Sequence, residues 1–145
     1  MEYKITSYQP SDYKALEALW ISTGLGNAAR GDNQQTIAET LALEGVLYVM
    51  KTEPGNELIG TSWITNDGRR LYLHHFGIKP EYQNQGLSKP LLKKSLEFAK
   101  QMNRQIKLEV HRDNLPALTL YEKSGFTYLG DYLVYIIRKP GEIIL

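Results

Sequence analysis

The sequence predicts a mixed α/β fold in which helices cover a single sheet. Short runs of alternating or apolar residues are typical of strands, and longer stretches place apolar residues three and four positions apart, as helices do. Turn residues separate these segments. In chain order the elements are β-α-α-β-β-β-α-β-α-β-β. This order is neither that of a regular doubly wound sheet nor that of a barrel.

The N-terminal part is predicted to form a strand followed by helices. Residues 2–8 alternate between polar and apolar side chains, as a half-buried strand does. A helix is expected to begin at residues 11–12, where helical spacing of apolar residues starts, and to end within residues 23–27. A further helix is expected to begin near Asp32, with Ile37 facing the core.

The middle of the chain is typical of an antiparallel meander. Residues 46–51 and 58–65 are strand-like, and a turn containing proline and glycine joins them. The Asp-Gly pair at residues 67–68 predicts a tight hairpin turn. A strand over residues 71–79 follows, and Pro80 ends it because proline cannot donate a hydrogen bond to a sheet.

The C-terminal part is predicted to contain helices and strands in alternation. Residues 87–102 have helical periodicity, and residues 106–110 are typical of a short strand. Asn114 is a favourable N-cap for the next helix, which Gly125 is expected to end. The last predicted strands cover residues 126–129 and 132–138.

The composition fits one globular domain over residues 1–145. The net charge of +1 provides no broad field to attract nucleic acid or an anionic membrane. No apolar run approaches the ~20 residues that span a bilayer, and no signal peptide is expected. The absence of cysteine excludes disulfides, a thiol nucleophile and Cys-ligated zinc. We therefore expect a cytoplasmic protein.

The loop at residues 83–88 has the composition of an anion site. It follows a strand that ends at Pro80 and leads directly into a helix. Backbone N–H groups and the positive end of the helix dipole meet there, an arrangement that binds phosphate. The loop is not a P-loop, because Leu87 stands where lysine is required. A plain strand-to-helix connection is the alternative interpretation.

A second segment, after the strand at residues 106–110, carries a family resemblance. Together with the loop, it resembles the GCN5-related N-acetyltransferases (GNAT) and is similar to their ribosomal-protein N-terminal acetyltransferase-like branch. The predicted order of elements also resembles that of the family. The family's loop pattern, Gln/Arg-x-x-Gly-x-Gly/Ala, and its later pattern match these residues: Gln83, Gly86, Ser88, Asn114, Ala117, Leu120, Tyr121, Gly125 and Phe126.

The resemblance implies a GNAT fold and acetyl-CoA as the co-substrate, without a metal. The pantetheine arm is expected to lie along the strand at Phe76, Gly77 and Ile78. Asn114 and Tyr121 are further implied cofactor-binding positions. Ser88 replaces the family's glycine or alanine, so its hydroxyl either donates to the pyrophosphate or crowds it. The residues implied to hold the pyrophosphate are Gln83, Asn84, Gln85, Gly86, Leu87, Ser88 and Lys89.

By the same resemblance, Tyr121 is the expected general acid. A reference pKa of ~10 keeps tyrosine protonated at neutral pH, and a coenzyme thiolate needs a proton on leaving. The alternative for Tyr121 is a half-buried packing role. The general base is expected to be Glu109, His74 or a water chain. For Glu109 the alternative is an exposed strand carboxylate, and for His74 it is a packing histidine.

The neighbouring histidines argue against a metal site. On a regular strand His74 shares one face with Tyr72 and Phe76, and His75 lies on the other face. Adjacent imidazoles that point apart cannot chelate one ion.

The resemblance implies an enzyme that moves an acetyl group from acetyl-CoA directly to a primary amine. The acceptor is expected to be a peptide N-terminus, a lysine or a small amine. The alternative function is a CoA-binding sensor or structural domain with little catalysis. Neither nucleic acid nor a membrane is an expected partner, but the apolar residues 143–145 favour a homodimer contact.

Overall fold

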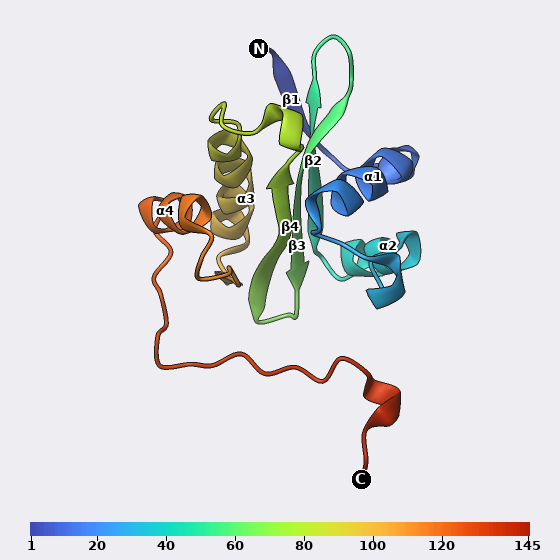
Figure 1. Cartoon of the computed structure of the whole chain (residues 1–145), viewed down its shortest axis with the longest axis vertical. Coiled ribbons are helices and arrows are strands. Elements are labelled where there is room, and N and C mark those ends of the chain that lie inside the picture. Colours follow the sequence, from blue (N-terminus) through green and yellow to red (C-terminus); the bar gives the residue numbers. More distant parts are fainter. The chain divides into compact units, whose positions relative to one another are not determined.

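The computed structural model describes residues 1–145, which divide into two units, Met1–Val110 and His111–Leu145. In the N-terminal unit a five-stranded sheet lies between helices on both of its faces (Figure 1). The strand order is β1-β2-β3-β4-β5, so strands that are neighbours in the sheet are also consecutive in sequence. No helix combines the length and apolar character needed to cross a bilayer.

The sheet is antiparallel except at one edge, which confirms the predicted mixed sheet. The strands are β1 (Tyr3–Ser7), β2 (Val46–Thr52), β3 (Leu58–Asn66), β4 (Arg70–Ile78) and β5 (Gln105–Leu108). The first four pair antiparallel in turn, whereas β4 and β5 pair in parallel. A parallel pair needs a long crossover, and the helix between β4 and β5 provides it.

Three longer helices cover the sheet as the periodicity predicts. α1 (Tyr13–Thr23) and α2 (Gln34–Ala42) cover one face, and α3 (Ser88–Met102) covers the other (Figure 1). α2 begins slightly later than Asp32, because the Asn33 side chain caps it by accepting a backbone N–H of its first turn at 2.9 Å. Short 3-10 turns precede α1, α2 and α3.

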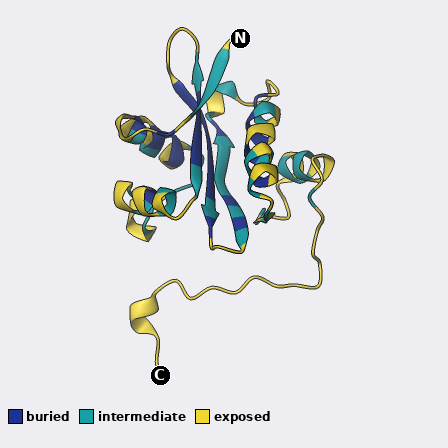
Figure 2. Cartoon of the chain, turned by 180° about the vertical axis from the view of Figure 1, so that it is seen from behind, coloured by how far each residue is buried: buried dark blue, intermediate teal, exposed yellow.

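Each face of the sheet has its own apolar core, and Figure 2 shows the buried sheet between exposed helix surfaces. Because both faces are covered, all but one of the residues of β3 are buried. On the α1 and α2 face the core includes Leu16, Trp20, Ile37, Val49 and Trp63. On the α3 face it includes Met50, Ile59, Ile78, Leu87 and Leu91.

The C-terminal unit contains α4 (Leu115–Lys123) and a long extended segment. Asn114 caps α4, as predicted, with its side-chain oxygen accepting a backbone N–H of the first turn at 3.4 Å. The rings of Tyr121 and Phe126 pack edge to face, 5.7 Å apart. Beyond Phe126 the only regular element is a 3-10 turn, Pro140–Glu142.

The predicted strands at residues 126–129 and 132–138 are therefore wrong. A turn forms between them, with the Tyr132 N–H donating to the Leu129 carbonyl at 3.1 Å, but the arms do not pair. Residues 132–137 are all apolar, which is typical of a strand buried on both faces. In the structure all of them are exposed (Figure 2). Nothing within this unit covers such a strand, and an isolated hairpin is marginal in water.

Candidate active site

The loop between β4 and α3 presents a row of free backbone donors. None of the N–H groups of residues 84–88 donates a hydrogen bond within the protein. α3 begins at Ser88, and its N-cap, Leu87, supplies no side-chain acceptor. Residues 83–86 are exposed, whereas Leu87 is buried and anchors the loop to the core. Free donors and the positive end of a long helix together favour an anion at this loop.

Two residues of this loop adopt the left-handed conformation. Gly86 has φ +77° and Asn84 has φ +63°, values that glycine and asparagine tolerate best. No atom lies within 4 Å of the position that a Cβ on Gly86 would take, so the space above it is open. The Gln83 amide donates to the Ile78 carbonyl at 2.9 Å. Gln83 thus ties the loop to the end of β4.

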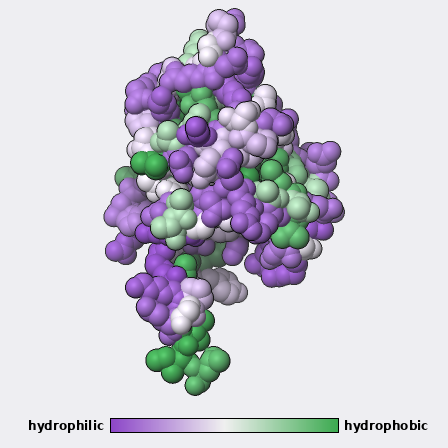
Figure 3. All heavy atoms as spheres, turned by 90° about the vertical axis from the view of Figure 1, so that its right-hand side faces the viewer, coloured by the Kyte–Doolittle hydropathy of each residue, from purple (hydrophilic) through white to green (hydrophobic).

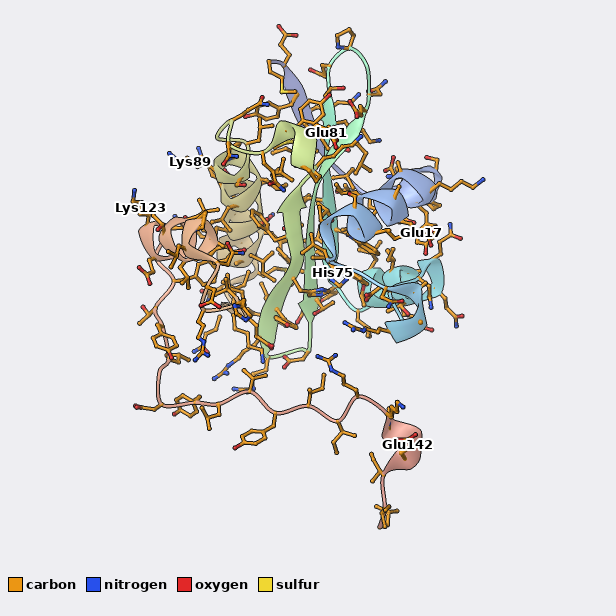
Figure 4. The ribbon with its side chains drawn as sticks, viewed as in Figure 1. Glu17, His75, Glu81, Lys89, Lys123 and Glu142 are labelled. Carbon is orange, nitrogen blue, oxygen red and sulfur yellow. The ribbon has the colours of Figure 1, made fainter.

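The other predicted phosphate residues lie at the start of α3. Lys89 is exposed, and its side chain projects away from the sheet (Figure 4). Ser88 is half-buried, and its hydroxyl forms no hydrogen bond within the protein. A cationic side chain and a free hydroxyl next to unbonded N–H groups increase the attraction for a phosphate.

A gap opens between β4 and β5. Their pairing ends at Leu73 and Leu108, where β5 stops, while β4 continues for five more residues, 74–78. This part of β4 pairs with β3 on one side, whereas its pairing with β5 on the other side has ended. An unpaired strand edge can accept an extended chain as an additional strand. The predicted pantetheine residues Phe76, Gly77 and Ile78 lie on this edge.

A β-bulge in β4 overturns the prediction that His74 and His75 face opposite ways. His75 and Phe76 together lie opposite Ser62 of β3, and His75 has φ +47°. The extra residue shifts the alternation. His75 therefore contacts Trp20 and Trp63 of the α1 and α2 face, where His74 also contacts Trp63. Phe76 instead packs with the core cluster of the α3 face.

The two imidazoles touch each other and are largely covered. Their Nδ1 atoms are 2.6 Å apart, and the ring of His74 lies 4.7 Å from that of Trp63. Burial, together with the neighbouring His75, lowers the pKa of His74 to about 3, and burial also lowers the pKa of His75. Both rings are therefore neutral at neutral pH. No group of three or more His, Cys, Asp or Glu side chains is placed to hold a metal ion.

Glu109, the other predicted base, follows directly after β5 and is exposed. Its carboxylate faces the hydroxyl of Tyr72: burial and the Glu109 charge raise the pKa of Tyr72 to about 12. The Tyr72 ring lies 5.0 Å from that of His74. The structure thus brings both candidate bases to one region of the gap, with Tyr72 in contact with each.

A pocket of about 360 Å³ lies beside the histidines. Its residues are Glu17, Trp20, Ile21, Gly26, Asn27, Ala28 and Asp32. Trp20 is also part of the core: it stacks on Trp63 with ring centres 5.4 Å apart, and its indole N–H donates to Thr61 at 3.2 Å. Core packing is therefore the main role of both tryptophans, which are buried in the same core cluster.

Asp32, which lines this pocket, contacts His75, and the sequence does not reveal this contact. Oδ2 of Asp32 lies 3.2 Å from Nε2 of His75 and accepts the Asn27 N–H at 2.7 Å. In Figure 4 His75 lies on the side of β4 that faces α1 and α2. From the sequence, an aspartate before a helix is expected to be a capping residue, and regular strand alternation places His75 on the face opposite His74. No sequence pattern therefore predicts a contact between Asp32 and His75.

The remaining predicted residues, Asn114 and Tyr121, belong to the C-terminal unit. The side-chain oxygen of Asn114 is engaged in capping α4. Burial raises the pKa of Tyr121 to about 12, so its hydroxyl keeps its proton at neutral pH. The acid role of Tyr121 and the cofactor role of Asn114 stay predictions.

Solved structures with this fold include several acetyltransferases. A GNAT-family acetyltransferase from Staphylococcus aureus aligns with a TM-score of 0.77 and 20% identity, over 90% of this chain and 88% of that one. A GNAT-family acetyltransferase from Elizabethkingia anophelis, solved with acetyl-CoA bound, aligns with a TM-score of 0.62 and 22% identity, over 87% and 76%. These similarities establish the fold.

Curated relatives and a family profile extend the similarity to sequence. N-alpha-acetyltransferase RimI of Mycobacterium tuberculosis is 36% identical over 52% of this chain and 49% of its own length. A mycothiol acetyltransferase of Clavibacter sepedonicus is 30% identical over 70% of this chain and 33% of its own length. The chain thus spans about half or less of these relatives. The profile of the acetyltransferase (GNAT) family matches residues 13–126. The predicted family is confirmed: this chain belongs to the GNAT acetyltransferases.

Proposed function

We propose that this chain transfers the acetyl group of acetyl-CoA to a primary amine. The observation that carries the proposal is the row of unbonded N–H groups at residues 84–88, next to the stretch of β4 that continues beyond its pairing with β5. A pyrophosphate followed by an extended amide chain requires these features side by side. Family membership and the acetyl-CoA bound to the E. anophelis acetyltransferase support the choice of co-substrate.

In this proposal the pyrophosphate lies on residues 84–89 and the pantetheine amides pair with β4 at residues 76–78. Gln83 acts indirectly, by holding the loop against the end of β4. Backbone N–H groups along the gap would stabilise the negative charge that develops on the acetyl oxygen as the amine attacks. Ser88 contributes a hydroxyl donor rather than an obstacle, because its side chain is only half-buried.

The transfer proceeds in a single displacement, without an acyl-enzyme. The amine nitrogen forms a bond to the acetyl carbon, the carbon–sulfur bond breaks, and the sulfur leaves as a thiolate. Tyr121, whose raised pKa keeps its hydroxyl protonated at neutral pH, donates the phenolic proton to that thiolate, and the phenolate then regains a proton from water. Glu109, His74 or a water held by them removes the proton from the amine.

The acceptor belongs to the wide class of peptide N-termini, lysines and small amines. The relatives carry different names, an N-alpha-acetyltransferase and a mycothiol acetyltransferase, so they favour no single acceptor. We further propose that the chain works in the cytoplasm as one domain over residues 1–145. A homodimer contact through residues 143–145 is proposed because these apolar residues are exposed.

Calorimetric titration with acetyl-CoA tests the co-substrate site. We expect micromolar binding by the wild type and at least about tenfold weaker binding by Gly86→Trp, whose side chain would fill the open space above the loop. Gly68→Trp is the matched control, because Gly68 also has a positive φ and open surroundings but lies in the turn between β3 and β4. Equal affinity for both variants would contradict the site.

Amine-dependent release of free thiol tests the reaction. A panel of a peptide, a lysine derivative and small amines should include at least one that accelerates thiol release. Saturable binding of acetyl-CoA with no turnover on any amine would instead support a CoA-binding sensor and overturn the enzymatic proposal.

A further inference from the structure

A chain of three side chains connects the pocket to the gap between β4 and β5. Oδ2 of Asp32 lies 3.2 Å from Nε2 of His75, and Nδ1 of His75 lies 2.6 Å from Nδ1 of His74. His74 is the first residue beyond the last β4–β5 pair. We propose that Asp32 and His75 are positioning residues that hold His74 in the tautomer whose Nε2 accepts the proton of the acceptor amine. This inference rests on the proposed function and selects one base.

Hydrogen-bonding chemistry fixes the direction of this chain. A carboxylate only accepts, so contact with Asp32 favours a proton on Nε2 of His75. A neutral imidazole carries a single N–H, so Nδ1 of His75 is then an acceptor and Nδ1 of His74 must be the donor. Nε2 of His74 is left with a free lone pair. A change at Asp32 is therefore expected to move the protons on both rings.

The fold holds the middle of this chain rigidly. His75 occupies the left-handed region, which is uncommon for a residue other than glycine and costs free energy. The ring of Trp20 lies 4.7 Å from that of His75. Gly26 packs closely against the same His75 ring, because a Cβ at this position would lie only 3.1 Å from the ring. Asp32 is fixed in turn by the backbone N–H of Asn27 at 2.7 Å.

Nε2 of His74 is accessible, although its ring is largely covered. Nε2 of His74 forms no hydrogen bond within the protein. The buried side-chain atoms that lack a partner are Nε of Arg70 and Nε2 of His75, so Nε2 of His74 is not buried. Nε2 of His75 is among them because its N–H is not aligned with Asp32 at 3.2 Å. Catalytic hydrogen bonds are often long or poorly aligned before substrate binds, and they tighten in the complex.

The proton balance of the step is simple. As the amine nitrogen bonds to the acetyl carbon, Nε2 of His74 takes a proton from that nitrogen and becomes an imidazolium. Bond formation makes the nitrogen far more acidic than a free ammonium, so a weakly basic imidazole is sufficient. The negative charge of Asp32 stabilises the positive charge that His74 and His75 then share. Release of that proton to water restores the neutral pair.

Nitrogen NMR of the full chain tests the proton positions independently of activity. The chain holds three histidines, and His111→Gln removes the exposed one, which simplifies assignment. We expect Nδ1–H on His74 and Nε2–H on His75 in the wild type. In Asp32→Asn the amide can donate to Nε2 of His75, so both tautomers should reverse. A wild-type His74 that carries its proton on Nε2 would overturn the inference.

Kinetics tests whether this arrangement matters for the reaction. Asp32→Asn should lower kcat about 10²-fold, within the range typical of a lost general base, and change KM for acetyl-CoA less than about twofold. Glu39→Gln removes an exposed carboxylate of α2 and should keep the wild-type kcat. An unchanged kcat in Asp32→Asn overturns this inference alone. A wild type without amine-dependent turnover overturns the proposed function and the role of His74 with it.

Discussion

At the scale of single residues, environment determines which groups can act. Partial burial raises the pKa of Tyr121 to about 12, and partial burial together with the Glu109 charge raises that of Tyr72 to about 12, so both are neutral donors. His74 and His75 are neutral for the same reason, but their pKa shifts the opposite way: burial disfavours the charged form, and for a base this lowers the pKa. The sequence identifies these residue types, but only their burial sets their protonation.

The acid role of Tyr121 predicts a large loss in Tyr121→Phe. This change removes only the hydroxyl, so we expect kcat to fall about 10²-fold while affinity for acetyl-CoA stays within about threefold. Thiol release and calorimetry measure the two effects. Tyr132→Phe, at an exposed position of the same unit, should behave as the wild type. A wild-type kcat in Tyr121→Phe would assign the tyrosine to packing.

The lowered pKa of His74 predicts a pH dependence of stability. A histidine with a pKa of about 3 in the folded state and 6.5 when unfolded binds more protons in the unfolded chain between these values. The free energy of unfolding should therefore rise with pH over this window, by up to about 1.4 kcal/mol per pH unit, and level off above it.

Urea unfolding between about pH 5 and about pH 7 measures this slope, above the range where carboxylates titrate. His74→Gln should reduce the slope, whereas His111→Gln, which removes an exposed histidine, should leave it unchanged. Equal slopes in the wild type and His74→Gln would show that folding does not lower the pKa of His74.

At the scale of elements, local sequence patterns predict the strands that pair within the sheet and the helices that have side-chain caps. β2, β3 and β4 follow the predicted meander, because alternation and turn residues specify them locally. The bulge at His75 has no such signal: a histidine pair within a strand reads as regular alternation. It exists because β3 and β4 are held together on both sides of it, so its cost is met by the pairs around it.

The contact between α3 and β3 includes a buried polar pair that can be tested. The hydroxyls of Ser62 and Ser95 lie 2.7 Å apart, and both residues are fully buried. Ser62→Ala alone should cost about 1–3 kcal/mol, because it leaves a buried hydroxyl with fewer partners. Ser95 also donates to the Leu91 carbonyl, so Ser95→Ala removes an additional contact.

A double-mutant cycle on this pair separates the effects. The loss in the double variant, measured by urea unfolding, should be smaller than the sum of the single losses by at least about 0.5 kcal/mol. Strict additivity would mean that the two hydroxyls do not interact.

At the scale of the whole molecule, the C-terminal segment carries many of the exposed large hydrophobic residues. Figure 3 shows hydrophobic atoms gathered at the end of the chain, where Ile144 and Leu145 are almost fully exposed. Residues 132–137 add a further exposed apolar run. Exposed apolar area of this kind marks an interaction site, which is the physical basis of the proposed homodimer.

The homodimer predicts a mass that depends on the C-terminal residues. Sedimentation of the full chain should give twice the monomer mass at micromolar concentration, and removal of residues 141–145 should shift it toward the monomer. The control variant Lys139→Gln keeps the apolar residues 143–145 and should retain the dimer mass. The same monomer mass with and without residues 141–145 would refute the contact.

The sequence alone determined the family, the mixed sheet and the loop that leads from β4 into α3, because each depends on residues close together in the chain. Glycine and free N–H groups before a helix, or a cap such as Asn114, act within a single turn. Tertiary structure alone decided that His75 turns toward His74 and meets Asp32, and that residues 126–138 remain unpaired. A bulge, a contact between distant segments and a strand all depend on partners that no local pattern specifies, because their free energy comes from packing and pairing with those partners.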